Sequence, residues 1–280
     1  MSCTRALLIV SLAAGGFAAG SGTESATALM PAKTQRPRRA PLVLPSALPA
    51  KSVRVPILMY HRVARRNDSL PGITRRLTVD PADFQRQMTW LVAHGFRSIT
   101  HRELFEALFG HRTLPARPVL ITFDDGYRNV LTDAAPILDR LGIRATAFVI
   151  TGRISNGDSS FLTWRQLRAL EGLGIEIGSH TVSHPDLRTL GDRALSAELI
   201  NSRRRLERAL EHPVQWLAYP YGGHDARVVA AARRAGYVLA STTLAGSRQD
   251  ARAPLELRRF SVVDSTGVEG LAGLLGFSRR

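Results

Sequence analysis

From residue 53 onward, short apolar runs alternate with longer segments in which apolar residues recur every three or four positions. The first pattern predicts buried strands and the second predicts amphipathic helices. The predicted strands are 53–60, 118–123, 144–150, 174–178, 214–219, 237–241 and 257–263. The predicted helices are 81–94, 101–109, 129–141, 163–173, 192–211 and 225–235. Such alternation predicts an α/β fold with a mostly parallel sheet, and the number of strands suits a barrel better than a short open sheet.

Several predicted helices begin with residues that cap helix N-termini. Asp80 precedes Pro81, Thr100 is followed three residues later by Glu103, and Thr163 precedes an amphipathic run. A side-chain oxygen at the capping position accepts a hydrogen bond from a free backbone amide of the first turn. We therefore expect helices to start at these three places.

The first 28 residues have the pattern of a secretory signal peptide. Arg5 gives a positive start, an apolar stretch follows, and Ala-Thr-Ala at 26–28 offers a cleavage site between small residues. This pattern predicts a secreted, periplasmic or cell-envelope protein. An uncleaved membrane anchor is the alternative, although the apolar stretch is short for a bilayer span. Residues 29–52, rich in Pro, Ala and Arg, are expected to link the signal to a single domain at 53–280.

Composition adds two constraints. The only cysteine, Cys3, lies in the predicted signal, so the mature domain is expected to have neither disulfides nor a cysteine metal site. Lys and Arg exceed Asp and Glu by 38 to 23, which gives a formal net charge of +15. The excess charge is dispersed, which favours anionic surfaces in general, and no nucleic-acid-binding motif accompanies it. We therefore expect no nucleic-acid partner, and the sequence gives no indication of an oligomeric state.

Polar residues gather directly after four of the predicted strands. The four clusters are Asp124 with Asp125, His180 with His184, the segment 219–221, and His61. In a parallel α/β barrel, the loops that follow the strands form the active site. We therefore expect these clusters, which are far apart in the sequence, to meet at one mouth of the barrel.

His180 and His184 are spaced so that both imidazoles can reach one metal ion. Alone, such a pair is a weak pattern, and two aspartates before a glycine often form an ordinary turn. Together, two histidines and one of the aspartates make the ligand set of a catalytic divalent metal site. The other aspartate is then free to accept a proton, and the cation relieves the repulsion between the two carboxylates. Gly126 supplies the tight turn that follows the strand.

Three motifs carry a family resemblance. They are TFDDG at 122–126, SHTVSH at 179–184 and YPYGG at 219–223. In this order and at these intervals, they resemble the polysaccharide deacetylase, or NodB-like, superfamily of metal-dependent carbohydrate esterases. The similarity extends over most of residues 53–263 and implies a distorted (β/α) barrel with about seven strands, fewer than the usual eight. It also implies an enzyme, a hydrolase that removes N-acetyl groups from an acetylated amino sugar and releases acetate.

The resemblance implies a role for each matching residue. Asp124 would be the catalytic base. Asp125, His180 and His184 would bind one divalent metal ion, zinc in the first place, with cobalt, nickel and manganese as alternatives. The backbone amide of Tyr221 would stabilise the oxyanion of the tetrahedral intermediate.

The chain departs from the family pattern at two places. Ala218 stands where family members usually have an arginine that pairs with the base, and no histidine after His224 matches the general acid of many members. The poly-β-1,6-N-acetylglucosamine deacetylases carry that histidine early, in a Tyr-His segment similar to ILMYHRV at 57–63. By that resemblance His61 would be the general acid, with His224 as the alternative. Arg259 would replace the missing arginine, and a purely structural buried arginine is the competing interpretation.

The function predicted from these patterns is metal-dependent N-deacetylation of poly-β-1,6-N-acetylglucosamine, so the expected partner is an N-acetylglucosamine polysaccharide. Chitin oligomers and peptidoglycan are alternative substrates for the same chemistry. A sugar-binding module with a relic metal site is the non-enzymatic alternative, which the absent motif arginine favours and the intact aspartates and histidines disfavour. The aromatic residues Trp164, Trp216 and Tyr219 could either stack on sugar rings or pack in the core.

Overall fold

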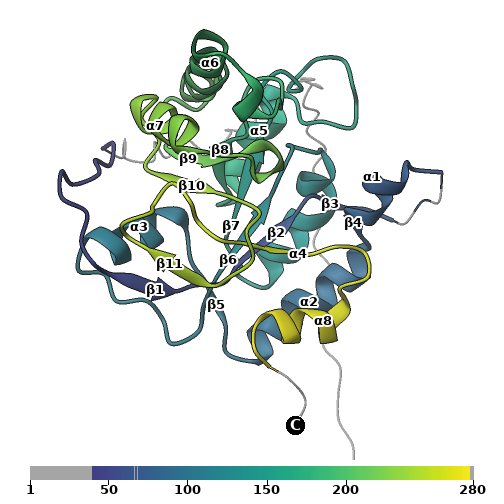
Figure 1. The fold of residues 1–280 in the computed structure, drawn as a ribbon. Helices are drawn as coiled ribbons and strands as arrows, with labels where there is room; N and C mark the ends of the chain where they lie inside the picture. Colours follow the sequence, from purple (N-terminus) through teal and green to yellow (C-terminus); the bar gives the residue numbers. More distant parts are fainter. Residues whose placement is uncertain (1–39, 66, 68, 278–280) are drawn as a thin grey trace, which may run out of the picture. The chain divides into compact units, whose positions relative to one another are not determined.

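Parallel strands form the centre of the protein, and the computed structural model describes residues 40–65, 67 and 69–277. The predicted signal peptide and the first part of the predicted linker lie outside these residues. The main sheet contains β2 (Ile57–Tyr60), β6 (Pro118–Phe123), β7 (Ala145–Val149), β8 (Glu176–Ser179), β9 (Trp216–Ala218), β10 (Leu239–Ser241) and β12 (Phe260–Ser261). Their order is β10-β9-β8-β7-β6-β2-β12, with β5 (Arg97–Ser98) beside β6. This curled, parallel sheet confirms the predicted α/β fold of barrel type (Figure 1).

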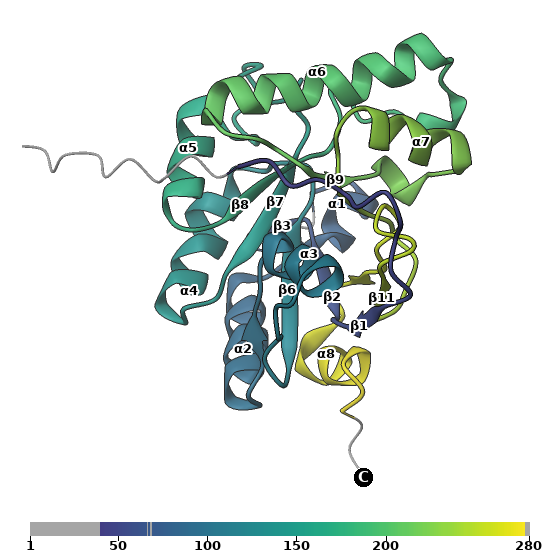
Figure 2. The same cartoon turned by 90° about the vertical axis from the view of Figure 1, so that its left-hand side faces the viewer.

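Helices surround the sheet (Figure 1, Figure 2). They are α1 (Gly72–Arg76), α2 (Pro81–Ala93), α3 (His101–Phe109), α4 (Ala135–Arg140), α5 (Trp164–Gly172), α6 (Asp192–Leu210), α7 (Ala226–Arg234) and α8 (Gly267–Leu274). A π-helical turn at Val130–Ala134 leads into α4, and short 3-10 turns span Leu187–Thr189 and Pro220–Gly222. Helix α6 packs beside α7, and α2 packs beside α8. In the described part of the chain, no helix combines the length and the apolar character needed to cross a bilayer.

The predicted capping residues make the expected hydrogen bonds. The side chain of Asp80 accepts a bond from the amide of Ala82 at the start of α2. Thr100 and Glu103 form a reciprocal capping box at α3, and Thr163 does the same with a glutamine at α5. Local polar sequence therefore determines where these helices begin.

Both faces of the sheet are buried, which explains the continuous apolar runs. Along β6, Ile121 belongs to a cluster that includes Phe84 and Met88 of α2, whereas its neighbour Leu120 belongs to a second cluster with Phe105 of α3. Successive side chains of a strand point to opposite faces, so a strand covered on both sides has no polar alternation. A third buried cluster joins α6 and α7 to β9 and β10.

One predicted strand is divided in two, so the prediction of a single strand over 53–60 is corrected. Strand β1 (Ser52–Arg54) pairs antiparallel with β11 (Arg248–Asp250) in a separate two-stranded sheet, and only β2 joins the main sheet. Pro56 lies between β1 and β2, and proline has no amide to donate to a strand ladder. A further small pair, β3 (Arg62–Val63) with β4 (Thr78–Val79), follows β2.

Residues 40–52, in the second half of the predicted linker, lie against the folded domain. The backbone of Leu42 exchanges two hydrogen bonds of 2.7 Å with the side chain of Gln215. Leu42 and Leu44 pack on the second hydrophobic cluster. The two leucines thus bury apolar surface in a segment whose Pro-rich composition suggested a linker.

Residues 254–261, here called the seam segment, connect the two edges of the curled sheet. On one side, Leu257 donates its amide to the carbonyl of Ala240 and accepts a bond from the amide of Thr242, at the end of β10. On the other side, β12 pairs with β2. Arg259 lies between these two attachments, with its side chain fully buried. The seam segment therefore carries an arginine directly to the mouth of the sheet.

Candidate active site

The four polar clusters that follow separate strands lie together at the carboxyl ends of those strands. Asp124 and Asp125 directly follow β6, and His180 directly follows β8. Tyr221 follows β9, and its ring lies 4.6 Å from that of His184. One mouth of the sheet thus gathers side chains from elements that are distant in the sequence, as expected for parallel α/β folds.

Asp125, His180 and His184 form a compact group of donor atoms. The Nε2 atom of His180 lies 3.6 Å from Oδ1 of Asp125, and Nε2 of His184 lies 3.8 Å from the same oxygen. The two Nε2 atoms are 3.1 Å apart. The three ligand atoms therefore face one shared point, lying within 4.8 Å of one another.

The geometry and chemistry of this group fit a divalent metal ion. In a tetrahedral site with bonds of about 2.1 Å, neighbouring ligand atoms are about 3.4 Å apart, close to the separations of this group. The Nδ1 atom of His180 donates to the carbonyl of Ala218 at 2.7 Å, which leaves Nε2 free to coordinate. Burial lowers the pKa of His180 to about 3, so its imidazole is neutral, as a ligand must be.

Asp124 forms an ion pair with Arg259 of the seam segment. The guanidinium donates two hydrogen bonds of 2.8 Å to the two carboxylate oxygens, and both side chains are buried. Arg259 also donates to the carbonyl of Thr242 at 2.9 Å and to the hydroxyl of Thr122 at 3.3 Å. Burial alone would raise the pKa of Asp124, but Arg259 and the nearby histidines outweigh it and lower that pKa to about 2. The carboxylate is therefore ionised at neutral pH.

Asp125 has the opposite electrostatic environment. Burial, followed by the charge of Asp124, raises the pKa of Asp125 to about 7. The hydroxyl of Tyr127 donates a hydrogen bond to it and offsets part of this rise. Two adjacent carboxylates thus differ strongly in how easily they ionise, and Asp125 is the one that gains from a neighbouring cation.

His61 lies directly after β2, close enough to Asp124, Arg259 and His184 for their charges to affect its pKa. Burial lowers its pKa, the charge of Asp124 raises it in part, and Arg259 and His184 lower it further. Within the described residues, its buried Nδ1 atom makes no hydrogen bond. The imidazole therefore has one ring nitrogen without a protein partner at the mouth that contains Asp124.

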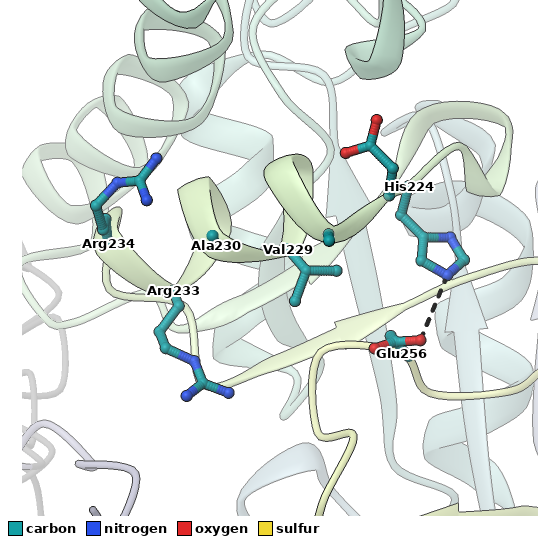
Figure 3. A pocket seen from close by; sticks show the side chains of 8 residues that line it. His224, Val229, Ala230, Arg233, Arg234 and Glu256 are labelled. Atoms are coloured by element: carbon teal, nitrogen blue, oxygen red, sulfur yellow. Dashed lines mark ion pairs between the residues drawn. The ribbon is translucent and has the colours of Figure 1, made fainter.

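His224, the alternative acid, lines a different cavity of about 660 Å³. Figure 3 shows its ring directed at Glu256, with Arg233 and Arg234 of α7 further along the same cavity. Its Nε2 atom lies 3.7 Å from the carboxylate of Glu256, and Nδ1 bonds the carbonyl of Gly222 at 2.8 Å. These contacts engage both ring nitrogens of His224 outside the aspartate and histidine cluster.

Backbone strain is concentrated at the mouth. Among the described residues, six that are not glycine have positive φ, and four of these are Asp125, Thr181, His184 and Tyr221. Such conformations cost free energy and persist where surrounding contacts enforce them, often at functional sites. Gly126 has a φ of +83°, and a Cβ there would lie 3.0 Å from the side chain of Val149. The turn after the aspartates therefore requires glycine.

Some residues at the site had no signal in the sequence analysis. Tyr127 stacks on Phe161 with ring centroids 4.9 Å apart, and Arg62 and Arg153 lie over the two rings, at 4.8 Å and 5.2 Å from the centroids. This stack flanks Asp125, and only the position of Tyr127 directly after the TFDDG motif could have suggested it. The aromatic residues Trp216 and Tyr219 are buried, so they pack in the core rather than offer a surface to sugars.

Comparisons with known proteins identify the family of this chain. The family model described as polysaccharide deacetylase matches residues 111–240. YxkH of Bacillus subtilis (strain 168), assigned by name to the polysaccharide deacetylases, is 31% identical over 222 residues, which cover 79% of this chain and 75% of YxkH. The poly-β-1,6-N-acetyl-D-glucosamine N-deacetylase of Staphylococcus aureus (strain NCTC 8325 / PS 47) is 27% identical over 201 residues, with coverage of 64% and 68%.

Solved structures are similar over most of the chain. The deacetylase PplD of Streptococcus pyogenes, in complex with acetate, superimposes with a TM-score of 0.73 at 29% identity and covers 80% of this chain and 99% of its own. IcaB from Ammonifex degensii superimposes with a TM-score of 0.68 at 25% identity, and the match covers 79% of this chain and 97% of IcaB.

Proposed function

The chain belongs to the polysaccharide deacetylase family, and we propose that it removes N-acetyl groups from poly-β-1,6-N-acetylglucosamine with one divalent metal ion. The observation that carries this proposal is the convergence of Asp125, His180 and His184 beside the Asp124–Arg259 pair. The relatives named for this polymer support the choice of substrate. So does His61, which lies at the same mouth in a segment that resembles theirs.

Asp125, His180 and His184 would hold the metal ion. When bound, a divalent cation supplies Lewis acidity, which polarises a carbonyl group and makes water a better nucleophile near neutral pH. Zinc suits two imidazole nitrogens and one carboxylate oxygen, and cobalt, nickel and manganese accept the same donors. Bonding of His180 Nδ1 to the Ala218 carbonyl orients the ring for this role.

Asp124 is proposed to accept the proton of the attacking water. Its carboxylate is ionised at neutral pH because Arg259 outweighs the effect of burial. Arg259 binds both oxygens and thereby fixes the plane of the carboxylate. It would thus take the role of the arginine that family members usually have at the position of Ala218. The backbone amide of Tyr221 is proposed to donate a hydrogen bond to the negative charge that develops on the acetyl carbonyl oxygen when water attacks.

His61 is proposed to give a proton to the leaving amine. An amine leaves poorly from a tetrahedral carbon unless it is protonated, so amide hydrolysis requires an acid at this step. Because burial lowers the pKa of His61, its imidazole is neutral at rest, and the proton that it delivers has to reach it during turnover. We propose that the proton taken from water by Asp124 passes to His61, which leaves the carboxylate ionised again. The charge of that carboxylate raises the pKa of His61 and so favours the protonated imidazole.

We further propose that the protein acts outside the cytoplasm, after removal of residues 1–28. The basic start, the apolar stretch and the small residues at 26–28 support this location. Intact mass and N-terminal sequence of the protein recovered from culture fractions test it. A mature N-terminus near residue 29 would agree, whereas an intact Met1 in the membrane fraction would indicate an uncleaved anchor.

Acetate release from matched β-1,6- and β-1,4-linked N-acetylglucosamine oligomers tests the proposed function. The assay uses the full chain loaded with zinc or cobalt, and Asp125→Ala as the control. Release from the β-1,6 series that disappears in the control is the expected result. Release from the β-1,4 series alone would support the proposed chemistry but indicate chitin or peptidoglycan as the substrate. No release from either series by metal-loaded protein would refute the proposed activity.

A further inference from the structure

The loop that carries both histidines, residues 179–184, is held by hydrogen bonds to two residues of helix α6. Glu198 accepts hydrogen bonds from the amides of Val182 (2.8 Å) and Ser183 (2.9 Å) through one carboxylate oxygen. Its other oxygen accepts a bond of 2.6 Å from the hydroxyl of Ser183. One side chain of α6 thus satisfies three donors in the stretch between His180 and His184.

A second residue of α6 holds the other end of the loop. The hydroxyl of Ser202 shares a 2.7 Å hydrogen bond with that of Ser179, and both side chains are buried. Ser179 in turn accepts a bond of 3.2 Å from the amide of Thr181. Glu198 and Ser202 are four residues apart, so they lie on the same face of the helix, one turn from each other.

The backbone of this loop is strained, so contacts from other parts of the chain have to hold it in place. Thr181 and His184 have φ values of +67° and +64°, a region that residues other than glycine rarely adopt. Within the loop, the amide of His184 bonds the hydroxyl of Thr181 at 3.0 Å. From the opposite side, Gly152 donates its amide to the carbonyl of Val182 at 2.8 Å. The loop is therefore held between the chain after β7 and helix α6.

We infer that Glu198 and Ser202 are positioning residues that hold His180 and His184 in the geometry required for metal binding. The inference rests on the metal site proposed above. Glu198 acts directly on the backbone of the loop, whereas Ser202 acts through the hydroxyl of Ser179, which accepts the amide of Thr181. Both thereby set where the two imidazoles point. Groups that orient metal ligands from behind usually change metal affinity by about 10- to 100-fold when they are removed.

Cobalt affinity of the full chain, freed of metal and titrated against a competing chelator, tests this inference. Glu198→Ala is expected to weaken cobalt binding at least about tenfold and to alter the visible absorption of the bound cobalt. Glu198→Gln retains one acceptor oxygen and the shape of the side chain, so its affinity is expected to lie between those of Glu198→Ala and the wild type. Because the glutamine variant is nearly isosteric, it also serves if the alanine variant does not fold.

Glu207→Ala is the matched control, since Glu207 also lies on α6 and its carboxylate also accepts a backbone amide, that of Val214 at 3.1 Å. The control is expected to lower the thermal midpoint of the metal-free protein without a change in cobalt affinity. Wild-type affinity and absorption in Glu198→Ala, or an equal loss of affinity in the control, would overturn the positioning role alone. If cobalt binds Asp125→Ala as tightly as the wild type, the proposed metal site fails, and this inference fails with it.

Discussion

Replacement of Arg259 by methionine isolates the contribution of the ion pair at the mouth. The substitution keeps most of the side-chain volume but removes the charge and leaves Asp124 buried without its partner. A pKa lowered from 3.8 to about 2 corresponds to roughly 2.4 kcal/mol of stability at neutral pH, at about 1.4 kcal/mol per pKa unit. Removal of one partner from a buried ion pair typically costs about 3–5 kcal/mol, because the remaining charge is uncompensated. We therefore expect a loss of about 3–5 kcal/mol in the free energy of unfolding at pH 7.

The dependence of this loss on pH follows from the sign of the pKa shift. In the wild type, Asp124 has a lower pKa in the folded than in the unfolded state, so its contribution is present above about pH 4 and is lost as the pH falls through about 2. In Arg259→Met the effect of burial is no longer opposed by the guanidinium and raises the pKa of Asp124. The variant therefore loses stability as the pH rises above about 4, and the gap to the wild type narrows toward pH 3.

Urea denaturation at a series of pH values between 3 and 8 measures this gap. Arg258→Met is the matched control. Because Arg258 is exposed, its replacement is expected to change the free energy of unfolding by less than about 0.5 kcal/mol. Adding Asp124→Asn to Arg259→Met removes the uncompensated charge and should restore part of the lost stability. A gap that stays constant between pH 3 and pH 8 would refute the reasoning from the ion pair.

Four further substitutions test the site. Asp124→Asn should lower kcat by about 10²–10⁴ while zinc affinity, measured by calorimetry, stays within a few fold of the wild type; normal turnover would exclude Asp124 as the base. His61→Ala should lower kcat over the same range in acetate-release kinetics, whereas His224→Ala should retain turnover, and the reverse pattern would transfer the acid role to His224. Gly126→Ala should lower the free energy of unfolding by at least about 1–2 kcal/mol, because the new Cβ meets Val149 at a positive φ; a urea midpoint equal to that of the wild type would contradict this.

The sequence predicted those parts of the fold that leave a local periodic signal. The helices at 101–109 and 192–210 agree with prediction to within a residue, since an amphipathic pattern defines both and the Thr100 capping box marks the start of the first. Two-residue strands such as Arg62–Val63 are too short for a periodic pattern to emerge. The division at Pro56 was also missed, although the missing amide of proline could have indicated it.

At the site, the sequence pointed to the side chains that are proposed to carry chemistry and missed those that hold them in place. Asp124 and Arg259 are 135 residues apart, and their pairing was anticipated only through a family resemblance. Glu198 looks like an ordinary polar residue of a helix surface, and its bonds to two backbone amides have no counterpart in any sequence pattern. Contacts from a side chain to a distant backbone depend on how the chain packs, and they become visible only in three dimensions.

The seam segment has a consequence for the order in which the protein matures. Synthesis proceeds from the N-terminus, so Asp124, Asp125, His180 and His184 leave the ribosome before Arg259, which directly precedes β12, the last strand of the main sheet. Until that arginine docks, a nascent or truncated chain has to accommodate the carboxylate of Asp124 without its counter-charge. Closure across so long a stretch of chain is intrinsically slow. Competence for catalysis should therefore be acquired last, as a late step that follows assembly of the rest of the sheet.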